Sequence, residues 1–333
     1  MKILFVGPGL MPIPNPGWGA VEIVIWQMKI NLEKAGQTAD ILNRRGLIPA
    51  LKTKPWDYDL VHLEYDDLAG FWLILARIFK FKLVITSHYG YSAWPTKWHW
   101  SYRRIFRKLL KAPTLIVLSE EIKATYLQAG YSGMIEVLPN GTEVADINFS
   151  LEGQKDLICL GKIEPRKRQC ELAEIFSRQS NLKIDFVGPI VDKRFRCNNQ
   201  TTFYLGSWTR AEVQQNLTQY KALVLLSDGE AHALVIGEAL AAGLSLIISP
   251  EAAANLDLSQ PFVQIIRDDQ ELLASAQSVC LANSRYRSMI RKYAQNNFTW
   301  THIIQRYLVI VEKILMPEKY AVSRQVTKNY REK

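Results

Sequence analysis

The stretch GEAHALVIGEALAAGLSLIISPE, from Gly229 to Glu251, decides the fold of this 333-residue chain. In it a helical pattern runs directly into the apolar segment Ser245–Ile248, and another apolar segment, Ala222–Leu226, comes just before it. Strand, helix and strand in this order build a parallel sheet that is covered on both faces by helices. The stretch therefore predicts a Rossmann-like α/β domain.

The same alternation extends along the chain in both directions. Amphipathic stretches such as Val21–Leu32 and Tyr102–Leu110 predict covering helices. Short apolar runs predict strands at 2–6, 39–42, 60–63, 83–86, 115–118, 157–160, 184–187, 202–205, 222–226 and 245–248. We therefore expect an α/β protein with two Rossmann-like domains, whose parallel sheets face each other across a cleft.

The domain limits follow from length and from one polar stretch. At roughly 150 residues a domain, the length predicts two domains. The polar stretch Asn140–Lys155 precedes a new strand, so we place the N-terminal domain at residues 1–150 and the C-terminal domain at 151–315. Residues 316–333 form a C-terminal tail, with the N-terminal domain as its candidate packing surface.

Composition excludes several classes of protein. Hydrophobic residues make up 48% and charged residues 22%, which is typical of a globular chain and not of a disordered one. No apolar run approaches the roughly 18–20 residues of a membrane-spanning helix, and Gly7-Pro8-Gly9 comes too early for a signal sequence. The four cysteines show no C-x-x-C pair and no metal-ligand spacing. We expect reduced thiols and a cytoplasmic location.

The net charge of +9 is concentrated in one segment. Between Leu68 and Ser119 there are nine Lys and Arg residues but no Asp or Glu, so the other 32 bases balance all 32 acids. The spacing of Tyr102, Ile105, Phe106 and Leu109 predicts a helix with one buried face, and its bases lie on the other side. The simplest interpretation is a packed helix with a solvated basic face.

A second interpretation of this segment is a surface for an anionic partner. Aromatic residues beside bases suit a phospholipid leaflet, a lipid-diphosphate acceptor or an acidic glycan. Contact with the inner face of the plasma membrane would then be peripheral, whereas nucleic acid is disfavoured because the sequence contains no nucleic-acid-binding module. The candidate residues are Trp94, Lys97, Trp98, Trp100, Arg103, Arg104, Arg107 and Lys108.

Two acids mark a candidate site in the C-terminal half. Glu230 follows the predicted strand 222–226, at the end of the sheet where α/β proteins bind ligands. Glu238 is the only charged residue between Glu230 and Glu251, and an ionised carboxylate is costly to bury unless it is hydrogen-bonded. It either pairs with a distant Lys or Arg, or accepts hydrogen bonds from ligand hydroxyls. We favour the ligand interpretation.

Three further segments suit anion or sugar binding. The basic run Lys162–Arg168 lies between a predicted strand and a helix, where an anion is favoured, although a solvated basic loop is an equal alternative. Gly17 and Gly19 would let backbone N–H groups approach an anion, but their loop lacks G-x-G-x-x-G spacing. His88 follows the predicted strand 83–86, and it is either structural or part of a site.

Together these motifs resemble the family 4 retaining glycosyltransferases of the GT-B fold, over essentially the whole chain. Glu230-x7-Glu238, followed by Ala-Leu-Ala-Ala-Gly, is similar to the family's E-x7-E signature. Gly161-Lys162 through Lys167 is similar to its GR-x-x-x-x-K segment, and Pro139-Asn140-Gly141-Thr142-Glu143 to its PNG-x-D segment. Phe298-Thr299-Trp300 resembles a closing FSW.

The resemblance implies a role for each candidate residue. Glu238 would hold the ribose hydroxyls of a nucleotide diphosphate sugar, Lys162 and Lys167 its diphosphate, and Glu230 the sugar hydroxyls. His88 would contact the sugar from the N-terminal domain. Gly17, Gly19, His232, Ala233, Leu234 and Val235 complete the donor-binding set.

The resemblance also implies the reaction. A sugar would pass from a UDP-sugar, or less favoured a GDP-sugar, to a glycan or lipid-linked acceptor. Configuration would be retained by front-face attack, without an enzyme nucleophile, a metal or another cofactor. The alternatives are a nucleotide-sugar epimerase of the same fold and a nonenzymatic protein that binds nucleotide sugars or polyanions.

Two departures from the family pattern bear on the donor. Lys162 replaces an Arg, which keeps the charge but loses the bidentate fork. The usual E-G-F-G-L reads Glu230-Ala231-His232-Ala233-Leu234, so that His232 adds a titratable group beside the donor. We expect donor preference or rate to differ from those of a typical member.

Overall fold

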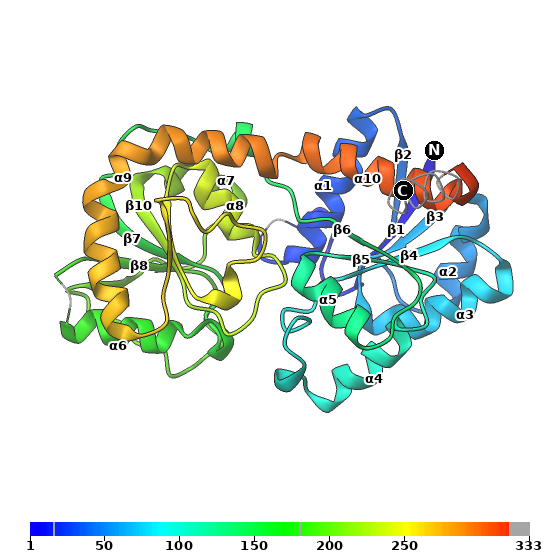
Figure 1. The fold of residues 1–333 in the computed structure, drawn as a ribbon, viewed down its shortest axis with the longest axis horizontal. Helices are drawn as coiled ribbons and strands as arrows, with labels where there is room; N and C mark the ends of the chain where they lie inside the picture. Colours follow the sequence, from blue (N-terminus) through cyan, green and yellow to red (C-terminus); the bar gives the residue numbers. More distant parts are fainter. Residues whose placement is uncertain (16, 180, 320–333) are drawn as a thin grey trace, which may run out of the picture. The chain divides into compact units, whose positions relative to one another are not determined.

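The computed structural model describes residues 1–15, 17–179 and 181–319, which form two compact units (Figure 1). The chain leaves the first unit after Leu138, forms most of the second unit from Pro139 to Thr299, and rejoins the first at Trp300. Of the tail predicted at 316–333, residues 320–333 lie outside the described part.

The first unit contains a six-stranded, fully parallel sheet in the order β2-β1-β3-β4-β5-β6. Its strands are β1 (Lys2–Val6), β2 (Thr38–Leu42), β3 (Leu60–Leu63), β4 (Leu83–Ser87), β5 (Thr114–Val117) and β6 (Met134–Val137). Strands are added on one side of β1 and then on the other, so the switch point of this sheet lies between β1 and β3.

The helices around the first sheet include one from the far end of the sequence. They are α1 (Ala20–Lys34), α2 (Leu47–Thr53), α3 (Ala69–Phe79), α4 (Trp100–Leu109), α5 (Glu120–Gln128) and α10 (Trp300–Leu315). Helix α10 packs beside α1 (Figure 1). It buries Ile303, Tyr307 and Val311, and the Tyr307 hydroxyl lies 2.9 Å from Nδ1 of His62 in β3.

This packing explains why the boundaries of the two units differ from the domain limits at residues 150 and 315 that we predicted from the sequence. The apolar face of α10 covers the first sheet, although the helix follows the whole second unit in the sequence. Helical periodicity shows that a helix has an apolar face, but it does not show which sheet that face covers.

The second unit contains another parallel sheet, in the order β12-β11-β10-β7-β8-β9. Its strands are β7 (Lys155–Leu160), β8 (Ile184–Val187), β9 (Thr202–Tyr204), β10 (Tyr220–Leu225), β11 (Ser245–Ile248) and β12 (Val263–Ile265). This is the strand order of a dinucleotide-binding Rossmann sheet, and its switch point lies between β7 and β10.

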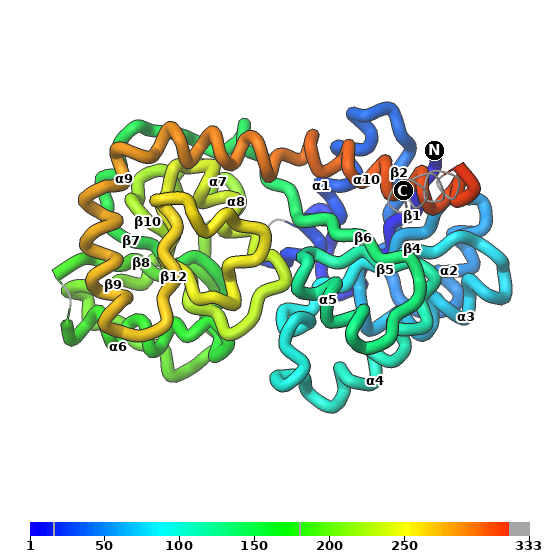
Figure 2. Tube along the Cα trace, viewed as in Figure 1, coloured from blue at the N-terminus to red at the C-terminus, as the bar shows by residue number. Residues whose placement is uncertain are grey.

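The second sheet is covered on both faces. Alternate residues of β7 enter two separate cores, Ile158 and Leu160 one of them, Leu157 and Cys159 the other. Helix α9 packs against β10 and β11, and Figure 2 shows its path along the second unit. The covering helices are α6 (Gln169–Gln179), α7 (Arg210–Asn216), α8 (Leu234–Ala241) and α9 (Asp269–Phe298).

The predicted fold class is confirmed, because each unit is a Rossmann-like parallel sheet with flanking helices. All ten predicted strands are present, whereas β6 and β12 were not predicted. Both are edge strands. They are short and carry a polar residue, Glu136 and Gln264, so neither forms a continuous apolar run. Within the described ranges, every helix is too short or too polar to cross a membrane.

Candidate active site

The strand order brings two loops of the second unit together. Strands β7 and β10 are neighbours, and their carboxyl ends at Leu160 and Leu225 lead into the loops 161–168 and 226–233. Ligands of open α/β sheets bind at this kind of switch point. The basic run and the first acid of the E-x7-E motif are therefore adjacent, although more than sixty residues separate them in the sequence.

Glu230 lies between two cations of the basic run. Its Oε1 is 3.0 Å from Nη1 of Arg166 and 3.8 Å from Nζ of Lys167, and the residue is 9% exposed. Arg166 also binds Glu164 at 2.8 Å and donates to the carbonyl of Gly229. Burial alone would lower the pKa of Arg166, but the carboxylates of Glu230 and Glu164 raise it. Arg166 is thus held charged at the switch point, and Lys167 lies beside it.

Arg166 had no role in our prediction, and the two predicted lysines differ in position. The side chain of Lys167 passes over Gly161, where an added Cβ would lie 2.9 Å from its Nζ. Lys162 is exposed and forms no ion pair with any residue of the described ranges. The structure therefore brings Lys167, but not Lys162, together with Glu230.

Glu238 is buried in α8 and forms an ion pair with Arg210 at the start of α7. Pairing with a distant base, the interpretation that we had not favoured, is thus present. Arg210 contacts Oε1 of the carboxylate. No sequence pattern pointed to Arg210, because it is 28 residues away from Glu238 on another helix.

His232 is joined to the PNG segment by two hydrogen bonds. Its Nδ1 accepts from the backbone N–H of Asn140 at 2.9 Å, and Nδ2 of Asn140 donates to the carbonyl of His232 at 2.9 Å. Since Nδ1 accepts, the ring proton is on Nε2, a buried atom with no hydrogen-bond partner in the described part. Burial lowers the pKa of His232 to about 4, against an opposing effect of Glu230. The ring is a neutral donor at physiological pH.

Three more residues of the predicted donor-binding set lie at the start of α8. Ala233 caps this helix, and Leu234 and Val235 are in its first turn. Backbone N–H groups of a first turn have no partner within the helix and favour an anion.

In the glycine loop, a Cβ on Gly19 would lie 2.4 Å from Nδ2 of Asn15, whereas one on Gly17 would meet nothing within 4 Å. Gly19 thus has a packing role of its own.

The first unit holds a second polar cluster, at the ends of β3 and β4. Nε2 of His88 lies 2.7 Å from Oε2 of Glu64, and the other oxygen of Glu64 lies 3.3 Å from Nε2 of His62. Burial raises the pKa of Glu64, but the two histidines and a hydrogen bond from Thr86 outweigh it, so the pKa is lowered. Burial lowers the pKa of His62. His88 is therefore held by an ionised, buried carboxylate.

Glu64 was not predicted from the sequence, although its position contains a signal. It comes directly after the predicted strand 60–63, just as His88 comes just after the predicted strand 83–86, and β3 and β4 are neighbours. Asp66 follows two residues later. Ser87 donates to its Oδ2 at 2.9 Å, and burial raises the pKa of Asp66 to about 6.

The predicted basic helix is present as α4. Tyr102, Phe106 and Leu109 are buried, and the four candidate bases of this helix are exposed. Trp98 packs on Tyr102 and Phe106, so it belongs to the helix's own core. Trp100 is 62% exposed, with the guanidinium of Arg104 over its ring.

One family model matches the N-terminal part of the chain. Residues 22–146 match the model of Glycosyltransferase Family 4. The predicted resemblance to this family is confirmed. No curated protein matches the sequence. The E-x7-E motif lies outside the matched residues.

Solved structures of glycosyltransferases match both units. Sucrose-phosphate synthase from Thermosynechococcus elongatus has a TM-score of 0.76 at 16% identity, over 95% of this chain and 100% of that chain. Anabaena Alr3699/HepE in complex with UDP-glucose has a TM-score of 0.75 at 16% identity, over 94% and 100%. A structure titled trehalose-6-phosphate from E. coli, bound with UDP-2-fluoro glucose, has 0.65 at 13%, over 94% and 99%. At these identities the likeness shows the GT-B fold.

Over residues 1–15, 17–179 and 181–319, no group of three or more His, Cys, Asp or Glu side chains is placed to hold a metal ion.

Proposed function

We propose that this protein is a retaining glycosyltransferase that transfers a sugar from a nucleotide diphosphate sugar to a glycan or lipid-linked acceptor. The observation that carries the proposal is the cluster of Arg166, Lys167 and Glu230 at the switch point of the second sheet. Two similar structures are titled as complexes with UDP-glucose and UDP-2-fluoro glucose. These titles support a UDP-sugar over a GDP-sugar.

The chemical demand of the reaction fits this cluster. As the glycosidic bond breaks, negative charge grows on the departing diphosphate, and preorganised cations stabilise that charge more than they stabilise the ground state. We assign Lys167 and Arg166 to this task, with the backbone amides at the start of α8. Lys162, exposed and unpaired within the described ranges, is assigned to the outer phosphate oxygens. The proposal requires no metal.

Glu230 and Glu238 receive different roles. Glu230 keeps Arg166 and Lys167 in place before the donor arrives, and then accepts hydrogen bonds from sugar hydroxyls. Arg210 holds Oε1 of Glu238, so we assign the other oxygen, Oε2, to the ribose hydroxyls. In this assignment the ion pair orients the carboxylate and does not compete with the ribose.

Two parts of the first unit complete the proposal. His88, held by Glu64, is the proposed contact to the transferred sugar, with retention by front-face attack. The exposed bases of α4, together with Lys97 and Trp100, are the proposed surface for an anionic acceptor or for peripheral contact with the inner face of the plasma membrane of a cytoplasmic protein. The balance of charge elsewhere supports this division, since the surplus bases lie in one segment.

A panel of UDP- and GDP-sugars tests the proposal. The purified protein is incubated with each donor, with and without candidate acceptors, and both the released nucleotide and the sugar products are measured. We expect release of the nucleotide together with transfer of the sugar, and NMR should show that the anomeric configuration is retained. An isomerised sugar without acceptor would indicate an epimerase, and binding without turnover would indicate a nonenzymatic binding protein. Mass spectrometry of any nucleotide that co-purifies identifies the base.

A further inference from the structure

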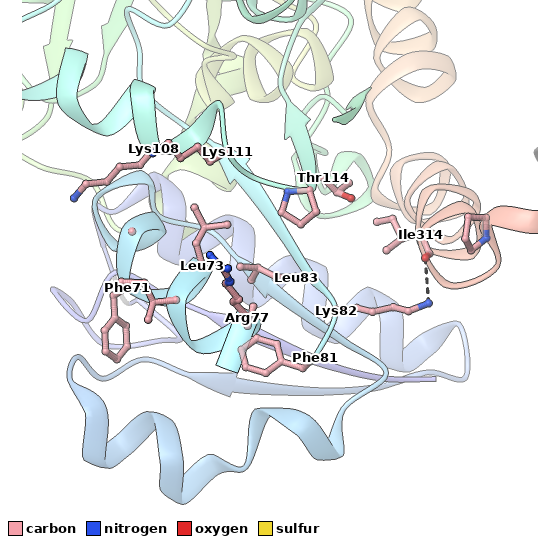
Figure 3. Close-up of a pocket in the computed structure, with 15 residues that line it drawn as sticks. Phe71, Leu73, Arg77, Phe81, Lys82, Leu83, Lys108, Lys111, Thr114 and Ile314 are labelled. Atoms are coloured by element: carbon pink, nitrogen blue, oxygen red, sulfur yellow. Dashed lines mark hydrogen bonds between the residues drawn. The ribbon is translucent and has the colours of Figure 1, made fainter. Parts of the chain in front are cut away.

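The first unit contains a pocket that borders the α4 surface proposed above for an acceptor or a membrane, and it shares Lys108 with that surface. It has a volume of about 1070 Å³ and is formed by α3, the start of β4, the turn between α4 and β5, and the end of α10 (Figure 3). This is at the upper end of the range for small-molecule sites. From the sequence we predicted an anionic partner for the segment between Leu68 and Ser119, but we named no candidate residue on α3, at the start of β4 or at the end of α10.

Most of the pocket wall is apolar. Phe71, Leu73 and Ile74 come from α3, Phe81 and Leu83 from the start of β4, and Ile314 from the end of α10. Ile74 is 62% exposed to solvent, as is Ile78 on the same helix. Neighbouring apolar side chains that are left exposed in this way mark binding surfaces for apolar ligands or partners. The wall is therefore suited to a hydrocarbon chain.

The remaining wall is cationic. Arg77, Lys82, Lys108 and Lys111 line the pocket, and none of its lining residues is acidic. Lys82 is occupied, because its Nζ donates to the carbonyls of Ile314 and Leu315 and so caps α10. The side chains of Arg77, Lys108 and Lys111 are exposed. Figure 3 shows Lys108 and Lys111 on the α4 side of the pocket.

An apolar wall beside three exposed cations is complementary to one chemical class. We infer that this pocket binds an anionic phospholipid, with a hydrocarbon chain against the α3 wall and the phosphate on Arg77, Lys108 and Lys111. Charge-assisted hydrogen bonds from Arg and Lys to phosphate are the strong ones. A free phosphate would leave the apolar wall uncovered, and a zwitterionic lipid would bring its own cation to the bases.

Charge also disfavours the last residues of this chain as the occupant. Residues 320–333 contain two Lys and two Arg against a single Glu, so they would bring positive charge to a positive pocket. The proposed lipid site does not rest on glycosyl transfer, and its test uses no donor. Because Lys108 also belongs to the surface proposed for an acceptor or a membrane, failure of lipid binding would count against that membrane contact but would leave the proposed glycosyl transfer standing.

Short-chain lipids below their micellar concentration test the inference on the unmodified full-length protein. Isothermal titration calorimetry with dihexanoyl phosphatidylglycerol, dihexanoyl phosphatidylcholine and glycerol phosphate separates charge from chain. We expect phosphatidylglycerol to bind at least tenfold more tightly than either of the others. Each methylene added to a chain within the pocket should tighten binding about fourfold. Equal binding of the two lipids, or no dependence on chain length, would overturn the inference.

Variants distinguish binding in the pocket from the nonspecific attraction of an anionic lipid to a basic protein. The double variant R77Q/K111Q should lose at least tenfold in affinity for phosphatidylglycerol. The matched control R285Q/K292Q removes the same charge from exposed positions of α9 in the second unit, and it should change the affinity less than twofold. Leu73→Trp fills the apolar wall without a change in charge and should also lose at least tenfold. The inference would be contradicted if the control lost as much affinity for phosphatidylglycerol as R77Q/K111Q does. It would also be contradicted if Leu73→Trp, with an unchanged Tm, lost no affinity. The chain-length series on the unmodified protein decides the matter if Leu73→Trp fails to fold.

Discussion

The loops at the carboxyl ends of the two sheets have opposite electrostatic character. In the second unit, Arg166 and Lys167 gather around Glu230 at the switch point, and the neutral His232 lies nearby. In the first unit, the carboxylates Glu64 and Asp66 are buried among histidines, hydroxyls and phenols. Similar sheets thus present cations in one unit and proton-binding groups in the other. In the proposed function the second unit stabilises the charge of the leaving group, and we expect proton-linked behaviour in the first unit.

The largest effect should come from removing a cation of the second unit. Lys167→Ala is expected to lower kcat by about 10²–10³, as the loss of one preorganised charge stabiliser typically does. Steady-state release of nucleotide from the best donor measures it. Lys193→Ala, an exposed position of the same unit, should leave kcat within twofold. An unchanged kcat in Lys167→Ala would remove this residue from the proposed role.

The next effect concerns stability and belongs to the first unit. Burial raises the pKa of Asp66 from 3.8 to about 6, so the folded state holds the proton more tightly than the unfolded state does. Stability then falls as the pH rises from 3.8 to about 6, and stays lower above it. Asp66→Asn has no carboxyl group to ionise, so its stability does not fall over this pH range for this reason. It should be more stable than the wild type by up to about 3 kcal/mol at neutral pH, and the gain should vanish near pH 4.

Urea unfolding as a function of pH measures this difference. Asp67→Asn is the matched control, because Asp67 is the exposed neighbour of Asp66 on the same turn. Since the charge of Asp67 is a smaller cause of the raised pKa of Asp66 than burial is, the control should show a much smaller gain in stability than Asp66→Asn. A destabilised Asp66→Asn at neutral pH would show that hydrogen bonds to the ionised carboxylate outweigh its burial.

A site residue could be predicted from the sequence when it lies in a compact motif, but not when it depends on a partner far along the chain. Lys167 and Glu230 were predicted because each belongs to a compact motif after a recognisable strand. Glu64 and Arg210 were missed because each is a single polar residue whose partner, His88 or Glu238, lies more than twenty positions away. Only strand order brings Glu64 to His88, and only the packing of helices brings Arg210 to Glu238. A pattern in one stretch of sequence does not contain that information.

A smaller effect should follow when the carboxylate that holds His88 is changed. Glu64→Gln keeps the size of the side chain but removes the charge beside His88 and His62. We expect kcat to fall about tenfold with little change in donor KM, because His88 remains present but is less firmly oriented. Glu121→Gln, an exposed position on α5, is the control. A large rise in donor KM would instead make Glu64 part of donor binding.

The smallest effect should come from His232, the neutral side chain of the candidate site in the second unit. The Nε2–H of His232 is a buried donor without a partner in the described structure, so a phosphate or sugar oxygen of the donor substrate is its proposed acceptor. His232→Phe keeps the ring and removes the donor. One neutral hydrogen bond is worth about 0.5–1.5 kcal/mol, so the donor KM should rise about three- to tenfold with kcat nearly unchanged. Because the pKa of His232 is lowered to about 4, the KM ratio of variant to wild type should stay constant from about pH 6 to pH 8. A ratio that grows towards pH 6 would mean that His232 binds the donor as a cation, and the two units would then differ less than their structures indicate.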